Sequence, residues 1–247
     1  MTPTRTLAVA LRGPAAGRGG RPRTLAMLVV IPCALMALLW WMYRDVPGVS
    51  PFDHLGPPLL AIFPFIVMFL VTSVTTLRER ASGTLERLLA MPLGRLDFLL
   101  GYGLAFGLLA AVQSGAAVGV AVGLLGMDVH GSVALLLLVA VADAVLGTAL
   151  GLFVSAFART EFQAVQFMPA LVVPQILLCG LFVARADLPG VLHAISEVLP
   201  LSYAVDAMQH LTVGSASSAV GRDLLVIVGY AVALLVLGAA TLRRRTP

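Results

Sequence analysis

The 247-residue sequence has few charged side chains and contains no lysine. Only 11% of its residues are charged and 60% are hydrophobic, whereas ordinary soluble domains have about 25% charged residues. So few polar side chains cannot cover a globular core of this size, and so hydrophobic a chain does not stay disordered in water. The composition therefore excludes a soluble globular domain and a disordered chain, and it predicts a polytopic membrane protein.

The sequence is also poor in residues that form disulfides or bind metals. Its two cysteines, Cys33 and Cys179, each lie within an apolar run and have no motif spacing. The histidines show no metal-ligand spacing; they are His54, His130, His193 and His210. We therefore expect buried thiols, packing or solvated histidines, and no metal site.

All 16 basic residues are arginines, and the net charge is +4. They lie at the ends of apolar runs, as topology signals do, and do not form a basic face interleaved with aromatic side chains. We therefore expect no nucleic-acid partner. The absence of lysine from a chain rich in alanine, glycine and arginine indicates a GC-rich bacterial genome.

Six apolar segments are long enough to cross about 30 Å of hydrocarbon as helices. They cover residues 24–43, 58–77, 96–125, 132–157, 164–183 and 223–242. The sequence thus predicts an all-α fold with one transmembrane domain over 24–242, between cytoplasmic tails at 1–23 and 243–247. We expect the first span to be retained, because Trp40 and Trp41 close it instead of the small residues of a signal-peptide cleavage site.

The orientation follows from the arginines. An even number of spans places both termini on one side, and thirteen of the 16 arginines lie on that side. The other three are Arg44, Arg185 and Arg222. Because cytoplasmic segments carry the excess of basic residues, we expect both termini in the cytoplasm and the chain in a bacterial inner membrane.

The connection 78–95 between the second and third spans contains a shorter helical pattern. Gly83 interrupts the helix that leaves the second span, Thr84 can cap a new helix, and Glu86 lies in its first turn. Three leucines share one face, and Pro92 ends the pattern. This predicts a short amphipathic helix at the membrane surface, which either lies on lipid or docks a soluble partner.

The segment 184–222 on the outer side is too long for a simple loop. Apolar residues recur at helical spacing from 188 to 199, Pro200 breaks that pattern, and 201–211 can form a second helix. Neither helix is long enough to span, and turns at membrane depth survive only where protein or water surrounds them. We predict a re-entrant or interfacial helical hairpin between the fifth and sixth spans.

Asp143 is the only ionisable residue well inside a predicted span, where a carboxyl group is costly. Its neighbours at a spacing of four are Gly147, Gly151 and Ser155, a stripe of small residues that lets helices pack closely. We therefore expect Asp143 to face protein or a cavity, either as a packing residue or as part of a substrate path.

Two glutamines are further candidates for a substrate path. Gln113 and Gln175 lie within the third and fifth spans, and interhelical hydrogen bonds explain them equally well. A second stripe of small residues, Gly115, Gly119 and Gly123, predicts close helix packing on the third span.

Two stretches of the sequence resemble the type-2 family of ABC-transporter permeases, in particular its daunorubicin-efflux and nodulation-export branch. The first is RERASGTLERLLAMPLGRLDFLLG at 78–101. The second is ARTEFQAVQFMPALVVPQILLCGLFVARADLP at 158–189, which runs into ISEVLPLSYAVDAMQHLTVG at 195–214. With the order of the six spans, the resemblance covers residues 25–242.

The resemblance implies a homodimeric permease that works with two copies of a separate P-loop ATPase subunit. That subunit would bind ATP and Mg, and this chain would bind no cofactor and have no catalytic residue. A chain without lysine cannot contain a Walker A motif. Family members begin with an interfacial helix, which the glycines and prolines of 13–23 disfavour here.

By the same resemblance, the segment after the second span is a coupling helix that docks on the ATPase, and the outer hairpin at 188–211 corresponds to re-entrant helices. The coupling role falls on Arg78, Glu79, Arg80, Gly83, Thr84, Leu85, Glu86 and Arg87.

The resulting interpretation is an exporter of a hydrophobic drug-like or lipid-like substrate. A stand-alone ion-coupled secondary transporter is the alternative; it would depend on Asp143 and on an ion gradient instead of an ATPase. An intramembrane protease is a weaker alternative, because the candidate nucleophile Ser114 has no histidine within a span to activate it.

Overall fold

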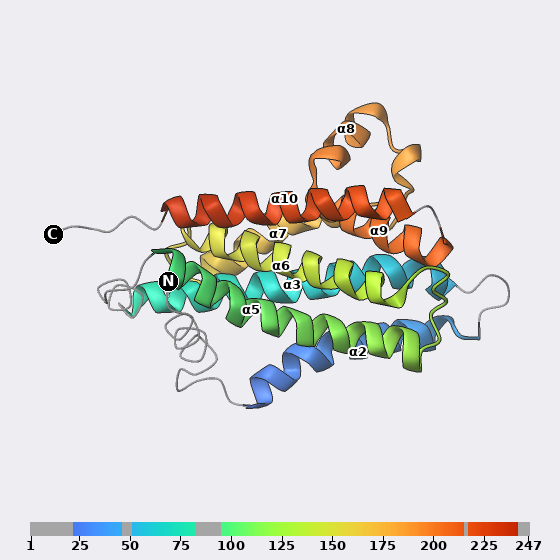
Figure 1. Ribbon diagram of the computed structural model, residues 1–247, viewed down its shortest axis with the longest axis horizontal. Coiled ribbons are helices and arrows are strands. Elements are labelled where there is room, and N and C mark those ends of the chain that lie inside the picture. The colour runs from blue at the N-terminus through green and yellow to red at the C-terminus, as the bar shows by residue number, and fades with distance from the viewer. Residues whose placement is uncertain (1–21, 46–50, 83–94, 215–216, 242–247) are drawn as a thin grey trace.

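The computed structural model describes residues 22–45, 51–82, 95–214 and 217–241, and every regular element within these ranges is a helix (Figure 1). Six helices are long and apolar enough to cross a membrane. They are α2 (Pro22–Tyr43), α3 (Pro51–Ala81), α5 (Arg95–Val118) with its π-helical continuation η1 (Gly119–Leu124), α6 (Val133–Ser155), α7 (Glu161–Leu178) and α10 (Ser217–Thr241). The predicted all-α fold with six spans is confirmed.

The helix ends differ from the predicted ones for local reasons. The fifth span, predicted to reach residue 183, ends at Leu178, because Gly180 adopts a left-handed backbone conformation with φ of 96°. The second span, predicted from residue 58, begins at Pro51, because helical hydrogen bonding continues beyond the apolar stretch that hydropathy detects.

The spans alternate in direction, so the bundle has two distinct ends (Figure 1). At one end α3 finishes and α7 begins; it carries Arg78 and Arg159, and we name it the arginine-rich end. Toward the other, the hairpin end, lie the short helices η2 (Arg185–Asp187), α8 (Gly190–Val198) and α9 (Pro200–Val213). The two helices predicted in the outer segment are therefore present, and Pro200 begins the second of them.

Helix α6 is the centre of the bundle and packs on α3, α5, α9 and α10. It is apolar on all sides, as expected of a helix surrounded by protein, and Leu136, Val139 and Leu146 are fully buried. Helices α2, α7 and α10 instead turn broad apolar faces outward. Exposed side chains on them include Met27, Trp41, Val165, Leu177, Leu225 and Val236. Such faces suit contact with lipid chains.

Two glycines bring α6 against the backbone of α3. A Cβ atom on Gly147 would lie 2.4 Å from the carbonyl oxygen of Phe65, and one on Gly151 would lie 2.5 Å from that of Phe69. Both distances are far below van der Waals contact, so only glycine fits. The small-residue stripe predicted beside Asp143 is confirmed as a close helix contact.

The second predicted stripe does not pack against another helix of this chain. A Cβ atom on Gly115, Gly119 or Gly123 would meet nothing within 4 Å, and Gly119 and Gly123 are exposed. The prediction of close packing is therefore wrong within the described chain. Small residues at a spacing of four permit a close approach, but they do not place a neighbour there.

We expect Gly147→Ala to destabilise the bundle by about 3 kcal/mol or more, because the added methyl group must displace the α3 backbone. Thermal unfolding in detergent, followed by size-exclusion chromatography, measures the effect. Gly115→Ala is the matched control and should leave stability unchanged or slightly raised. Equal melting temperatures for the two variants would contradict this account of the α3–α6 contact.

Candidate functional site

An ion pair joins α3 to α7 at the arginine-rich end. Arg78 donates from Nε to Oε1 and from Nη2 to Oε2 of Glu161, both at 2.7 Å. Glu161 is the first residue of α7, where the helix dipole favours a carboxylate. Both side chains are exposed, by 65% and 49% respectively, so the pair is open to solvent.

The start of α7 is held in place by its own caps. The Oγ1 atom of Thr160 accepts a hydrogen bond from the backbone N–H of Gln163, and the Oε1 atom of Gln163 accepts one from the N–H of Arg159. These reciprocal bonds resemble a capping box. They fix the position from which Glu161 meets Arg78.

A small apolar cluster lies beside this ion pair. Leu77 of α3 is buried against Ala158 and Ala164, with Phe167 packed on them, apart from the main core. We name the cluster and the Arg78–Glu161 pair together the α3–α7 joint. It combines a cluster that excludes water with a directional, solvent-exposed ion pair.

The predicted coupling residues are only partly within the described chain. Arg78 lies in the joint, and Glu79 is half-buried and has an interaction partner. The Nε and Nη2 atoms of Arg80 are buried and have no hydrogen-bond partner among the described residues. The remaining predicted coupling residues lie outside the described residues; they are Gly83, Thr84, Leu85, Glu86 and Arg87.

Two of the predicted path residues lie at the same level inside the bundle. Asp143 and Gln113 are fully buried, and their side chains have no hydrogen-bond partner within the described ranges. Next to them, the hydroxyl of Ser114 donates to the carbonyl oxygen of Ala140 at 3.1 Å and joins α5 to α6. Gln113 lies eleven residues before the end of η1 and Asp143 ten residues after the start of α6, so each is about 15 Å from the hairpin-side end of its span, roughly half the hydrocarbon thickness.

Gln175 instead has one hydrogen-bond partner in its own helix and one in α9. Its Nε2 atom donates to the carbonyl oxygen of Leu171 at 3.0 Å, and its Oε1 atom accepts from the N–H of Leu201 at 3.4 Å. Leu201 lies in the first turn of α9, so Gln175 ties the last turn of α7 to the start of α9. Of the two interpretations offered for this residue, the hydrogen-bonding one has direct geometric support.

A clamp around Arg185 holds the hairpin end together. Its Nη1 atom is paired with Asp206 of α9, and its Nε atom donates to the hydroxyl of Ser196 of α8 at 3.2 Å. The guanidinium also lies 5.2 Å from the centre of the Tyr203 ring. Burial raises the pKa of Asp206 above that of an ordinary aspartate, and Arg185 opposes this shift.

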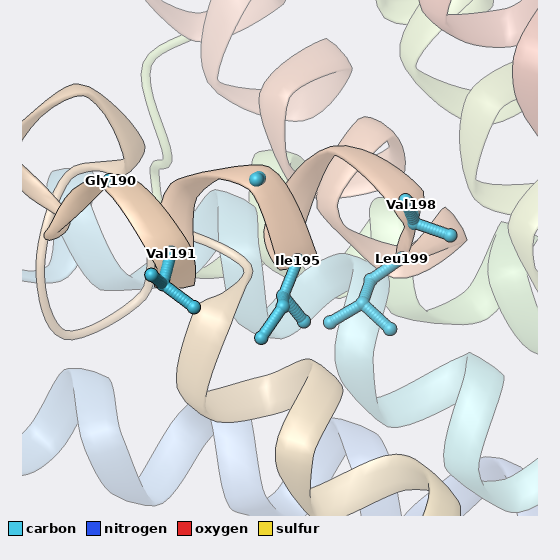
Figure 2. A pocket seen from close by; sticks show the side chains of 6 residues that line it. Gly190, Val191, Ile195, Val198 and Leu199 are labelled. Atoms are coloured by element: carbon cyan, nitrogen blue, oxygen red, sulfur yellow. The ribbon is translucent and has the colours of Figure 1, made fainter.

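The clamp leaves an apolar side of α8 uncovered. Val191 and Val198 are strongly exposed, and with Ile195 and Leu199 they line a shallow pocket. In Figure 2, Val191, Ile195 and Leu199 point to the same side of the helix. On its other side, α8 is anchored to α10, where the Tyr230 hydroxyl donates to the carbonyl oxygen of Val198 at 2.8 Å.

The histidines of the hairpin end make local contacts. The Nδ1 atom of His130 donates to the carbonyl oxygen of Thr212 at 2.6 Å. The Nδ1 atom of His210 lies 3.3 Å from a carboxylate oxygen of the buried Asp223, close enough for an ion pair though not aligned as a hydrogen bond. These contacts agree with packing histidines.

The sequence interpretation missed both ion pairs. Glu161 and Asp206 lie within the second stretch that resembles the permease family but were assigned no role, and Arg185 was considered only as a topology signal. A signal for Asp206 did exist, because a carboxylate and an arginine in an apolar outer segment are expected to pair.

With the geometry established, comparison with known proteins identifies the family. Residues 15–212 match the protein-family model described as ABC-2 type transporter. The chain belongs to the ABC-2 type transporter family. This confirms the resemblance inferred from the two sequence stretches, each of which contributes residues to the α3–α7 joint.

The relatives of this ABC-2 chain include transport permeases. Nodulation protein J of Rhizobium meliloti is 28% identical over 212 residues, covering 85% of this chain and 80% of that protein. The probable multidrug ABC transporter permease YbhS of Escherichia coli is 27% identical over 156 residues, or 63% of this chain. ABC transporter G family member 20 of Dictyostelium discoideum is 27% identical over 165 residues, or 67% of this chain. The chain matches only 41% and 23% of the length of the last two proteins.

We expect Arg185→Ala to loosen α8, because Asp206 loses its counter-charge and Ser196 loses a donor. Amide hydrogen exchange over residues 184–199 should accelerate by about tenfold or more. Arg222→Ala is the control, since the exposed Arg222 pairs only with its neighbour Asp223 among the described residues. Unchanged exchange in Arg185→Ala would show that the clamp does not hold α8.

Proposed function

We propose that the chain is the permease subunit of an ATP-binding-cassette exporter, which moves a hydrophobic drug-like or lipid-like substrate out of the cytoplasm or the inner leaflet. Membership of the ABC-2 type transporter family, on a bundle of six membrane-spanning helices, is the observation that carries this proposal. ATP would be hydrolysed by a separate P-loop ATPase subunit.

The orientation of the bundle in this proposal follows from charge. The arginine-rich end faces the cytoplasm of a bacterial cell, with both termini there, because basic residues concentrate on that side of inner-membrane proteins. The ATPase, with its ATP and Mg, docks at this end. Two permease copies and two ATPase copies make up the working unit.

The docking element in this proposal is the segment that follows α3. Helix α3 is continuous to Ala81 and leads directly toward 84–91, where the sequence predicts an amphipathic coupling helix. The buried Nε and Nη2 donors of Arg80, which have no hydrogen-bond partner among the described residues, lie next to that segment in the chain and suit carbonyl or carboxylate acceptors.

The substrate path in this proposal passes three polar side chains inside the bundle. Gln113 and Asp143 supply polar groups midway through the bundle, and Gln175 lies near the start of α9. A drug-like substrate is supported by the name of the YbhS relative, a probable multidrug permease. At the hairpin end, α8 and α9 would form the re-entrant cap of the exit, since α9 begins against Gln175 of α7 and reaches Gly131 near its other end.

A gradient-driven secondary transporter is the competing proposal. The unpartnered carboxyl group of Asp143, in the middle of the bundle, is the observation in its favour. The two proposals differ in energy source, and the presence of an ATPase partner separates them.

Affinity purification of the chain from its native membranes, followed by mass spectrometry, tests the proposal. We expect a P-loop ATPase at about one copy per permease, because each coupling segment offers one docking site. A folded permease that carries no ATPase in several mild detergents would favour the secondary transporter.

Reversing the charges of the predicted coupling helix should uncouple transport. In Glu86→Arg combined with Arg87→Glu, we expect ATP-dependent dye extrusion to fall by about tenfold or more, because like charges then face each other in the ATPase cleft. Expression and span integrity should persist, since both residues lie outside the six spans. Undiminished extrusion by the double variant would argue against the coupling assignment.

A further inference from the structure

We infer that the Arg78–Glu161 ion pair transmits movement of the coupling segment to α7, with Glu161 as the receiving residue. The inference rests on the proposed function and adds to it a positioning residue on a second helix. The sequence assigns no role to Glu161, and only the structure places it opposite Arg78.

The position of Arg78 on α3 suits it to this task. Arg78 lies in the last turn of α3, a single continuous helix whose described residues lead to the coupling segment at Gly83. A displacement of that segment therefore turns or tilts the same rigid element that carries the guanidinium. Near its middle, α3 is held by the close contacts of Phe65 with Gly147 and of Phe69 with Gly151, so a displacement at the arginine-rich end acts on the part of α3 beyond these contacts.

Helix α7 is weakly packed, so it can move when α3 is displaced. Within this helix only Ala164, Val172 and Gln175 are buried, and most of its surface faces away from the protein. It is attached through the α3–α7 joint at one end, through the Gln175 bond to α9 at the other, and in between through Val172, which is buried in the main core with Phe167 and Met168 packed against that core. A pull on Glu161 can thus shift α7 with few buried contacts to rearrange.

The chemistry of the pair suits a reversible link. The bidentate contact is directional, because two parallel N–H···O bonds fix the angle between guanidinium and carboxylate. Both groups are exposed, so the pair contributes little to folding and can part and re-form in solvent. The buried cluster of Leu77, Ala158 and Ala164 keeps the helices adjacent meanwhile.

The test is a distance measurement in the complex of this permease with its co-purified ATPase. Nitroxide labels at Gln166→Cys on α7 and Leu237→Cys on α10, both exposed positions, report the place of α7 in the bundle. Both labelling cysteines are introduced into a Cys33→Ala variant, so that Cys33 does not react with the label. Cys179 is kept, because it is fully buried and shielded from the label. Electron–electron double resonance is recorded without nucleotide and after trapping with ATP and vanadate.

We expect trapping to shift the distance between the labels when the pair is intact. Glu161→Gln should lose most of that shift while the ATPase remains bound and active, and Arg78→Glu should lose the shift as well. The charge-swapped variant, Arg78→Glu with Glu161→Arg, should regain it, which a merely structural role would not produce. Asp45→Asn, in the exposed Arg44–Asp45 pair at the opposite end, is the matched control and should keep the full shift.

The outcomes separate the two hypotheses. A full shift in both Glu161→Gln and Arg78→Glu would overturn the role of the pair and leave the proposed function standing. The absence of a bound ATPase, or of any shift with the pair intact, would overturn the proposed function and this inference with it. Loss in the single variants and recovery in the charge swap support the inference.

Discussion

The architecture depends on the approach of α6 to the backbone of α3 through Gly147 and Gly151. Inside a membrane, burying one apolar side chain against another gains little over contact with lipid, so helix association relies on close van der Waals packing. Two glycines one turn apart give α6 that contact, against the carbonyl oxygens of Phe65 and Phe69. The remaining helices are arranged around this pair, with α5, α9 and α10 on α6 and α7 on α3.

Some buried polar groups of the protein have hydrogen-bond or ion-pair partners in the fold, and others have none among the described residues. At the hairpin end, Arg185 is bonded to Asp206 and Ser196, which fixes α8 and α9. Midway through the bundle, Asp143 and Gln113 have no partner among the described residues. Unsatisfied polar groups are costly in such surroundings.

Packing is tight between α3 and α6 and loose around α7, which suits a transporter whose movement starts at the arginine-rich end. The α3–α6 contact resists deformation, whereas α7 has only three buried residues, of which Ala164 lies in the α3–α7 joint and Gln175 is bonded to α9. Movement delivered at the arginine-rich end can therefore reach α7 while the core stays packed. Family membership gives this arrangement its context, since several relatives are transport permeases.

The sequence by itself determined the class of protein, the six spans, the two short helices of the hairpin and the family, because these depend on composition, on local periodicity and on contiguous motifs. It also predicted the stripe containing Gly147, but the identical spacing of Gly115, Gly119 and Gly123 gave a wrong prediction. Only the tertiary structure decided which stripe meets a helix, and only it paired Arg78 with Glu161 and Arg185 with Asp206. The physical reason is that spacing along a helix defines a face, whereas the partner of that face comes from a distant part of the chain.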